Sequence, residues 1–263
     1  MSHKRSYNGI SHADLKEFLD EKVDKFNHPD FIERDPISIP HKYSRKDDIE
    51  LSGFLAATIA WGNRTMILRN SNLMMSFMDD SPYEFVMNHT DHDLERINCV
   101  IHRTFNSGDF IYFIKALKHI YKTYDGLEGV FTNYQTIDSL QPAIHQFRSV
   151  FFELPHENRT MKHISDPFKG SAAKKINMFL RWMIRKDNKG VDFGLWKSIS
   201  PSILSCPLDV HSGNVARRLG ILTRKQNDAR AVSELDKILR TFDKDDPAKY
   251  DFALFGLGVS EKF

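Results

Sequence analysis

A lysine and an aspartate with chemical potential each stand where the sequence predicts the start of a helix. Lys174 follows Gly170, and Asp209 follows Pro207. A carboxylate at a helix start lies at the positive end of the helix dipole and stays ionised. The dipole and desolvation lower the pKa of a lysine in such a place, so a neutral fraction exists at pH 7. The pair therefore fits an amine that forms a Schiff base with a sugar carbon, assisted by a carboxylate that stabilises a developing cation.

A purely structural role explains the same residues. Aspartate is a preferred N-cap residue, and Asp209 with Ser212 has the pattern of an ordinary helix start. Lys174 is expected nearly opposite the apolar stripe of its helix, with Lys175 at the edge of that stripe. His211 fits a hydrogen bond at the helix start as well as catalysis. These residues alone leave both interpretations open.

Other chemistries lack their sequence patterns. The chain has no GxSxG context, no glycine-rich phosphate loop and no HExxH pair. Its two cysteines, Cys99 and Cys206, are too few for a four-cysteine iron–sulfur cluster and have no metal-ligand spacing. We therefore expect no metal and no cofactor, no disulfide framework, and a reducing compartment.

Length and charge limit the class of protein. The chain has 263 residues, which fits one large domain or two close lobes. Its net charge is only +2, so any surface for a polyanion must come from clustered basic residues. No apolar run approaches the roughly 18 residues that span a bilayer, and the first residues lack a signal-peptide core. The sequence predicts a soluble, cytoplasmic protein without a membrane partner, and we expect a monomer.

Helical periodicity runs through the chain, and no sustained period-two alternation predicts a sheet. Ser11 and Asn63 are predicted N-caps, and either Asn227 or Asp228 caps a later helix. Besides the helices that carry Lys174 and Asp209, helices are predicted over residues 11–26, 44–60, 63–77, 82–87, 91–99, 109–124, 137–152, 193–199 and 227–239. The expected fold is all-α, a two-lobed helical bundle of about a dozen helices.

Two stretches together resemble the helix-hairpin-helix DNA glycosylase superfamily, which includes endonuclease III. They are GSAAKKIN at residues 170–177 and PLDVHSGNVARRL at residues 207–219. On this resemblance Asp209 matches the catalytic aspartate. Lys174 matches the nucleophile of bifunctional members, because an asparagine follows it by three residues. Lys175 is the alternative alignment.

A closer resemblance, over residues 45–262, is to a bacterial family of conserved hypothetical proteins. Its motifs P-L-D-x-H, L-G-L-L-T-R-K-Q-N-D and D-P-x-K-Y-D-F-A-L-F-G-L-G stand here at residues 207–211, 219–228 and 246–258. Together the two resemblances imply a glycosylase-like domain over residues 45–263, preceded by an N-terminal helix and loop extension over residues 1–44.

The glycosylase resemblance implies excision of a flipped, damaged base from double-stranded DNA, with or without AP-lyase activity. A long gap between Lys174 and Asp209 and the missing cluster resemble the archaeal 8-oxoguanine glycosylase, so 8-oxoguanine is the favoured lesion. The alternative is a non-catalytic nucleic-acid-binding protein of the same fold. A third interpretation is a scaffold protein, or an enzyme for a small molecule, that reuses the cleft expected between the two lobes.

The resemblance also implies two sets of DNA-contacting residues. The DNA backbone would be bound by Lys169, Gly170, Ser171, Arg217 and Arg218. The base pocket or wedge would be formed by Trp61, Asn63, Arg64, Phe168 and His211. This chain departs from the superfamily at the second hairpin glycine, which is Ala172 here.

Overall fold

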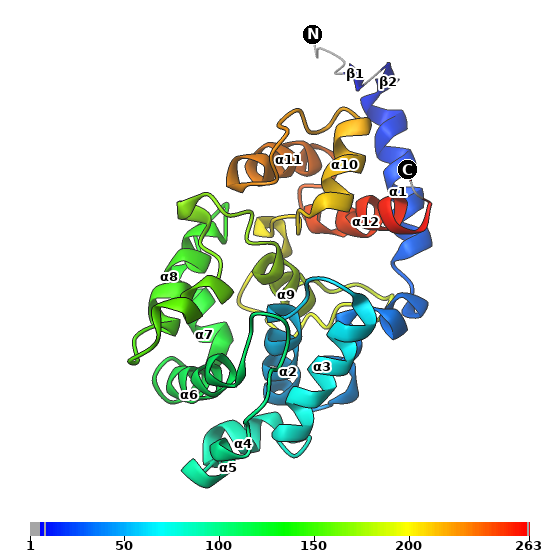
Figure 1. Ribbon diagram of the computed structural model, residues 1–263. Helices are drawn as coiled ribbons and strands as arrows, with labels where there is room; N and C mark the ends of the chain where they lie inside the picture. The colour runs from blue at the N-terminus through cyan, green and yellow to red at the C-terminus, as the bar shows by residue number, and fades with distance from the viewer. Residues whose placement is uncertain (1–5, 8, 262) are drawn as a thin grey trace. The chain divides into compact units, whose positions relative to one another are not determined.

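The computed structural model describes residues 6–7, 9–261 and 263 and is helical almost throughout (Figure 1). In this part of the chain there are twelve α-helices and seven short 3-10 helices, so the predicted all-α class is confirmed; the helix over Gly126–Tyr134 was not predicted. A sheet was not predicted, but two-residue strands β1 (Ser6–Tyr7) and β2 (Ile10–Ser11) pair antiparallel before the first helix. The α-helices are α1 His12–Phe26, α2 Lys46–Thr58, α3 Arg64–Phe77, α4 Pro82–Asn88, α5 Asp91–Glu95, α6 Ser107–Thr123, α7 Gly126–Tyr134, α8 Gln141–Phe151, α9 Lys174–Ile184, α10 Val210–Arg218, α11 Ala229–Phe242 and α12 Tyr250–Ser260.

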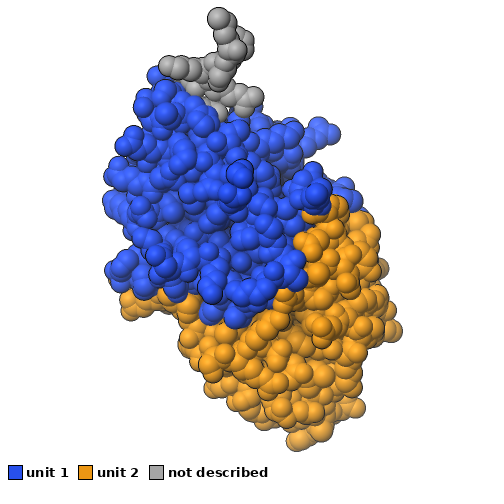
Figure 2. Space-filling view, turned by 180° about the vertical axis from the view of Figure 1, so that it is seen from behind, with its two compact units in different colours: residues 1–31, 137–140, 166–263 blue, residues 32–136, 141–165 orange. Residues whose placement is uncertain are grey.

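The chain forms two compact units, which Figure 2 colours separately. Unit 1 consists of Met1–Phe31, Ile137–Leu140 and Asp166–Phe263, and unit 2 of Ile32–Thr136 and Gln141–Ser165. The N-terminal extension that we expected over residues 1–44 is thus shared, because α1 belongs to unit 1 and the segment after residue 31 belongs to unit 2.

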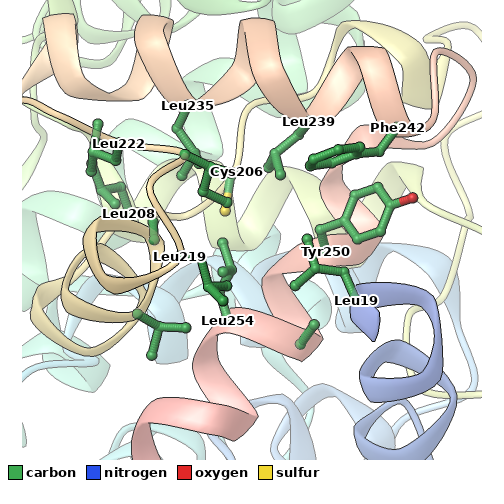
Figure 3. Close-up of a cluster of buried hydrophobic side chains, with 14 of the residues drawn as sticks. Leu19, Cys206, Leu208, Leu219, Leu222, Leu235, Leu239, Phe242, Tyr250 and Leu254 are labelled. Carbon is green, nitrogen blue, oxygen red and sulfur yellow. The ribbon is translucent and has the colours of Figure 1, made fainter. Parts of the chain in front are cut away.

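The core of unit 1 joins the two ends of the sequence (Figure 3). Leu19 of α1 is fully buried with Val215 and Ala216 of α10 and with leucines from α11 and α12, and the sulfur of Cys206 lies among the leucines. Polar contacts fix the same pairing, since the Tyr250 hydroxyl donates to Asp20 at 3.0 Å. At Gly256 an added Cβ would lie 2.3 Å from the Phe26 ring, so only glycine permits this approach of α1 and α12.

Helix α9 of unit 1 differs from its predicted amphipathic form. Every residue from 176 to 184 is buried, including the charged Arg181. Arg181 is paired with Asp192 and Asp251, and Arg185 after the helix is paired with Asp192 at 3.1 Å. These pairs supply the partners that buried charges require, so beyond Lys175 the polar face of α9 is interior rather than solvated.

Unit 2 is built around phenylalanines. Phe54 of α2 lies 6.0 Å from the Phe113 ring of α6 and 5.6 Å from the rings of Phe147 and Phe151 of α8. All four side chains are fully buried. Their stacking and edge contacts bury large apolar areas, which is the main source of stability for such a unit.

One predicted helix is wrong. Residues 193–199 are not helical, because their backbone is tied to the end of α9. The amide of Phe193 donates to the Trp182 carbonyl at 2.8 Å, and that of Trp196 donates to the Met183 carbonyl at 3.0 Å. The segment thus satisfies carbonyls that a helix end leaves without a partner. No helix in the described ranges is long and apolar enough to cross a membrane.

Candidate functional site

A tight turn in unit 1 precedes α9, where the sequence predicted a glycine hairpin. Gly170 has φ +89°, and the left-handed residue that follows is Ala173, with φ +47°, rather than Ala172. The Asp166 carboxylate accepts the Phe168 amide at 2.9 Å, which fixes the first half of the turn. Because an alanine at positive φ is strained, the surrounding contacts must hold this conformation. We call residues 166–173 the Gly170 turn.

Asn177 ties the start of α9 back to this turn. Its side-chain amide donates to the Ala172 carbonyl at 3.0 Å, and only 1% of the residue is exposed. Asn177, the residue that aligns Lys174 with the glycosylase nucleophile, therefore has a structural role in this chain. No side chain caps this end of α9, since Ala173 stands at the N-cap.

The two lysines at this helix start differ in their surroundings. Burial and the charge of neighbouring Lys174 lower the pKa of Lys175 to about 8. A lysine beside another cation, shielded from water, is the pattern that keeps part of an amine neutral at pH 7. The structure thus retains both lysines as candidate nucleophiles.

Asp209 is the N-cap of α10, as the sequence predicted. Its Oδ1 accepts the amides of His211 at 2.8 Å and Ser212 at 3.0 Å, and its own amide donates to the Ser212 hydroxyl at 2.9 Å. Oδ2 accepts no hydrogen bond from the described residues. The side chain is half-buried, so one oxygen is fixed by the helix and the other is available.

Sequence reasoning missed a third group, Asp251 of α12. It is buried, with one oxygen bonded by Arg181 and the other 3.8 Å from the Cys206 sulfur. Burial raises the pKa of Asp251 to about 6; the Arg181 charge opposes this, the Asp209 charge adds to it, and the Lys174 charge opposes it. Lys174 and Asp209 therefore both lie within electrostatic reach of one buried carboxyl. The only sequence signal was that Asp251 falls in an otherwise apolar helix.

Asn227 and Arg217 fix the backbone of Asp209 through a chain of hydrogen bonds. The Asn227 amide donates to the Asp209 carbonyl at 2.8 Å, and Arg217 donates to the Asn227 side chain and to the Arg224 carbonyl. An added Cβ at Gly213 would lie 2.6 Å from the Asn227 side-chain oxygen, so a larger residue here would displace the Asn227 side chain. Arg217, which we expected to bind the DNA backbone, has its guanidinium occupied inside unit 1.

The other expected contact residues of unit 1 lie at the surface. Phe168 is 61% exposed, and Lys169 and Gly170 are exposed beside it. Ser171 forms an isolated antiparallel bridge with Asp228. Arg218 and His211 are exposed as well, and the His211 ring lies 6.4 Å from that of Phe255.

The remaining expected base-pocket residues belong to unit 2. Trp61 is half-buried, and its carbonyl is hydrogen-bonded to His102 at 2.9 Å. The Asn63 side chain accepts the Met66 amide at 3.1 Å and caps α3, which confirms the predicted cap. Arg64 is the first residue of that helix. These contacts describe structural roles for Trp61 and Asn63.

Within the described ranges, no group of three or more metal-ligating side chains is found. Unit 1 instead offers two lysines at the start of α9, a carboxylate oxygen at the start of α10 and a buried carboxyl in α12. Such a set can hold a proton, supply an amine and stabilise a cation.

A comparison with known protein families assigns the chain to one of them. Residues 35–260 match the family described as "Protein of unknown function (DUF2400)", and the chain belongs to that family. This confirms the predicted membership of a family of hypothetical proteins. No curated protein and no solved structure matches the chain.

Proposed function

We propose that this protein is a DNA base-excision N-glycosylase with AP-lyase activity, built on a helix-hairpin-helix glycosylase-like fold. The observation that carries the proposal is the Asp209 carboxylate, which α10 fixes by one oxygen while the other accepts no hydrogen bond from the described residues; the charges of Asp209 and Lys174 both act on the buried Asp251. An amine and a fixed carboxylate are the two groups that cleavage of a glycosidic bond through a Schiff base requires.

In this mechanism the Lys174 amine attacks C1′ of a flipped nucleotide. The bond to the base breaks, the base leaves with the electron pair and takes up a proton, and Asp209 stabilises the positive charge on the sugar. The amine, now bonded to C1′, loses its first proton to solvent. The C1′–O4′ bond then breaks, O4′ keeps the electron pair and takes up a proton, and loss of the second amine proton gives an imine. An imine is reduced by borohydride to a stable amine, which links protein and DNA covalently.

The exposed end of the Gly170 turn supports DNA as the substrate. Phe168 and Lys169 stand at the surface within this turn, directly before Gly170, as an aromatic wedge and a phosphate contact would. The same surface would serve a non-catalytic nucleic-acid-binding protein, which is the second candidate. Cytoplasmic location, absence of a cofactor and 8-oxoguanine as the lesion remain parts of the proposal.

Borohydride trapping tests the proposal. The protein is incubated with duplexes that carry 8-oxoguanine, uracil, an alkylated adenine or an abasic site. We expect a covalent adduct that is lost in Lys174→Gln and in Asp209→Asn, and kept in a control, Lys186→Gln, whose lysine is exposed on the same segment. An adduct lost only in Lys175→Gln would assign the nucleophile to Lys175. Absence of adduct and of base release on every duplex would reject the enzyme.

A further inference from the structure

The loop between α10 and α11, residues 223–228, has no part in the proposed chemistry, yet it is fixed to the site on two sides. Asp228 bridges to Ser171, and the Ala229 amide donates to the Gly170 carbonyl at 3.1 Å. On the other side, Asn227 holds the Asp209 carbonyl. The loop therefore lies directly beside the Gly170 turn and the start of α10.

This part of unit 1 collects positive charge. Residues 168–175 and 223–230 contain six lysines and arginines and one carboxylate, while the whole chain has a net charge of only +2. The rest of the chain is therefore net acidic. The one carboxylate, Asp228, is neutralised by Arg224, which bonds both of its oxygens and lowers the pKa of Asp228.

The cations that remain available are on the surface. Lys169 on the turn, Lys225 on the loop and Arg230 in the first turn of α11 are exposed. Arg217 is occupied inside unit 1, so it does not supply this charge. A second carboxylate, Glu234, accepts both the amide and the hydroxyl of Thr223 at 2.6 Å and so holds the loop to α11.

We propose that residues 223–230 form a second binding segment for the DNA backbone, beside the Gly170 turn, and that Lys225 and Arg230 contact its phosphates. The inference rests on the proposed function for the choice of double-stranded DNA as the polyanion. Lysines and arginines presented on a fixed backbone suit phosphates, because they position a duplex without reading its sequence. Since the loop also holds Asp209, a strand bound there would be placed relative to the carboxylate.

The salt dependence of binding counts phosphate contacts. Each contact contributes about 0.9 to the slope of log K against log salt concentration. Binding of a short fluorescein-labelled duplex is followed by anisotropy from about 50 to 200 mM NaCl. We expect Lys225→Ala and Arg230→Ala each to reduce the slope by about 0.9, and the double variant by about twice as much.

Lys244→Ala is the matched control. Lys244 is 85% exposed and follows the far end of α11, which has 14 residues and is therefore about 20 Å long. Its removal should leave the slope unchanged, and thermal unfolding of each variant verifies the fold.

The outcomes separate the inference from the proposed function. If the wild-type protein binds DNA and neither single variant changes the slope, the inference is overturned and the glycosylase proposal stands. If both slopes fall but borohydride traps no adduct, the binding segment stands and the enzyme is rejected. If the wild-type protein binds no duplex at the lowest salt concentration, both are overturned.

Discussion

Two buried aspartates flank Cys206 in unit 1. Asp236 accepts the Cys206 amide at 3.0 Å, and Asp251 lies 3.8 Å from the Cys206 sulfur. Burial raises the pKa of each carboxyl to about 6. Burial also raises the pKa of the Cys206 thiol, which therefore stays protonated. These carboxyls gain their charge within the range of pH in which proteins are handled.

Asp236→Asn should change how stability depends on pH. Because the folded pKa of about 6 lies above the ordinary 3.8, the aspartate stabilises the fold most below pH 4, and this stability is lost as pH rises through 6. The difference between the pKa of about 6 in the folded protein and the ordinary 3.8 corresponds to about 3 kcal/mol. The asparagine can still accept the Cys206 amide but cannot ionise. We expect the variant to gain about 2 to 3 kcal/mol relative to wild type between pH 4 and pH 8 in urea unfolding.

Asp245→Asn is the control, since that side chain is 80% exposed. The difference in free energy of unfolding between this variant and the wild-type protein should be the same at pH 4 and pH 8. An equal difference for Asp236→Asn at both pH values would show that the buried carboxyl does not ionise differently in the folded and unfolded protein.

Part of the candidate site was predictable at this scale and part was not. Lys174 and Asp209 could be identified from the sequence, because a helix start is a local pattern. Asp251 and Asn227 act through contacts with residues far away in the sequence, and no local pattern reports such a contact. The burial that singles out Lys175 likewise depends on the packed unit.

At the scale of the element, α10 depends on its first residue. Asp209 accepts two amides, of His211 and Ser212, that would otherwise lack a partner. Asp209→Ala should therefore lower the free energy of unfolding by about 1 kcal/mol. Asp209→Asn should lower it by clearly less, because the amide oxygen still accepts both bonds. Urea denaturation of the two variants measures the difference.

The stability of these two variants also serves as a control for borohydride trapping with Asp209→Asn. A catalytic defect in Asp209→Asn cannot be attributed to loss of the cap if that variant is nearly as stable as the wild-type protein. Asn214→Ala, at an exposed position of the same helix, gives the baseline for a substitution without a cap effect. Equal losses for alanine and asparagine at residue 209 would contradict the capping role.

Helix starts were the elements that the sequence predicted best. Ser11, Asn63 and Asp228 are N-caps in the structure, each with its side chain bonded to a first-turn amide. Prediction failed where distant contacts decide. The segment 193–199 is held by carbonyls of α9, and the polar face of α9 is buried because aspartates elsewhere in unit 1 pair with its arginine.

At the scale of the molecule, unit 1 needs both ends of the chain. Helix α1 packs against α12, and the two helices cross in Figure 1, although they are separated by most of the sequence. Contacts of such long range are costly in chain entropy and leave no local pattern in the sequence, so local propensity cannot predict them. The division into units therefore follows packing rather than the sequence boundary at residue 44.

Leu19→Ala tests this dependence. Leu19 is fully buried between α1 and the C-terminal helices, so truncation should destabilise unit 1 by about 2 to 5 kcal/mol. Glu17 is exposed on the same helix, so Glu17→Ala should change the free energy of unfolding of unit 1 by less than about 0.5 kcal/mol. Because Trp182 and Trp196 belong to unit 1, fluorescence in a Trp61→Phe background reports that unit alone. A midpoint in urea that Leu19→Ala leaves unchanged would show that unit 1 is held together without its N-terminal helix.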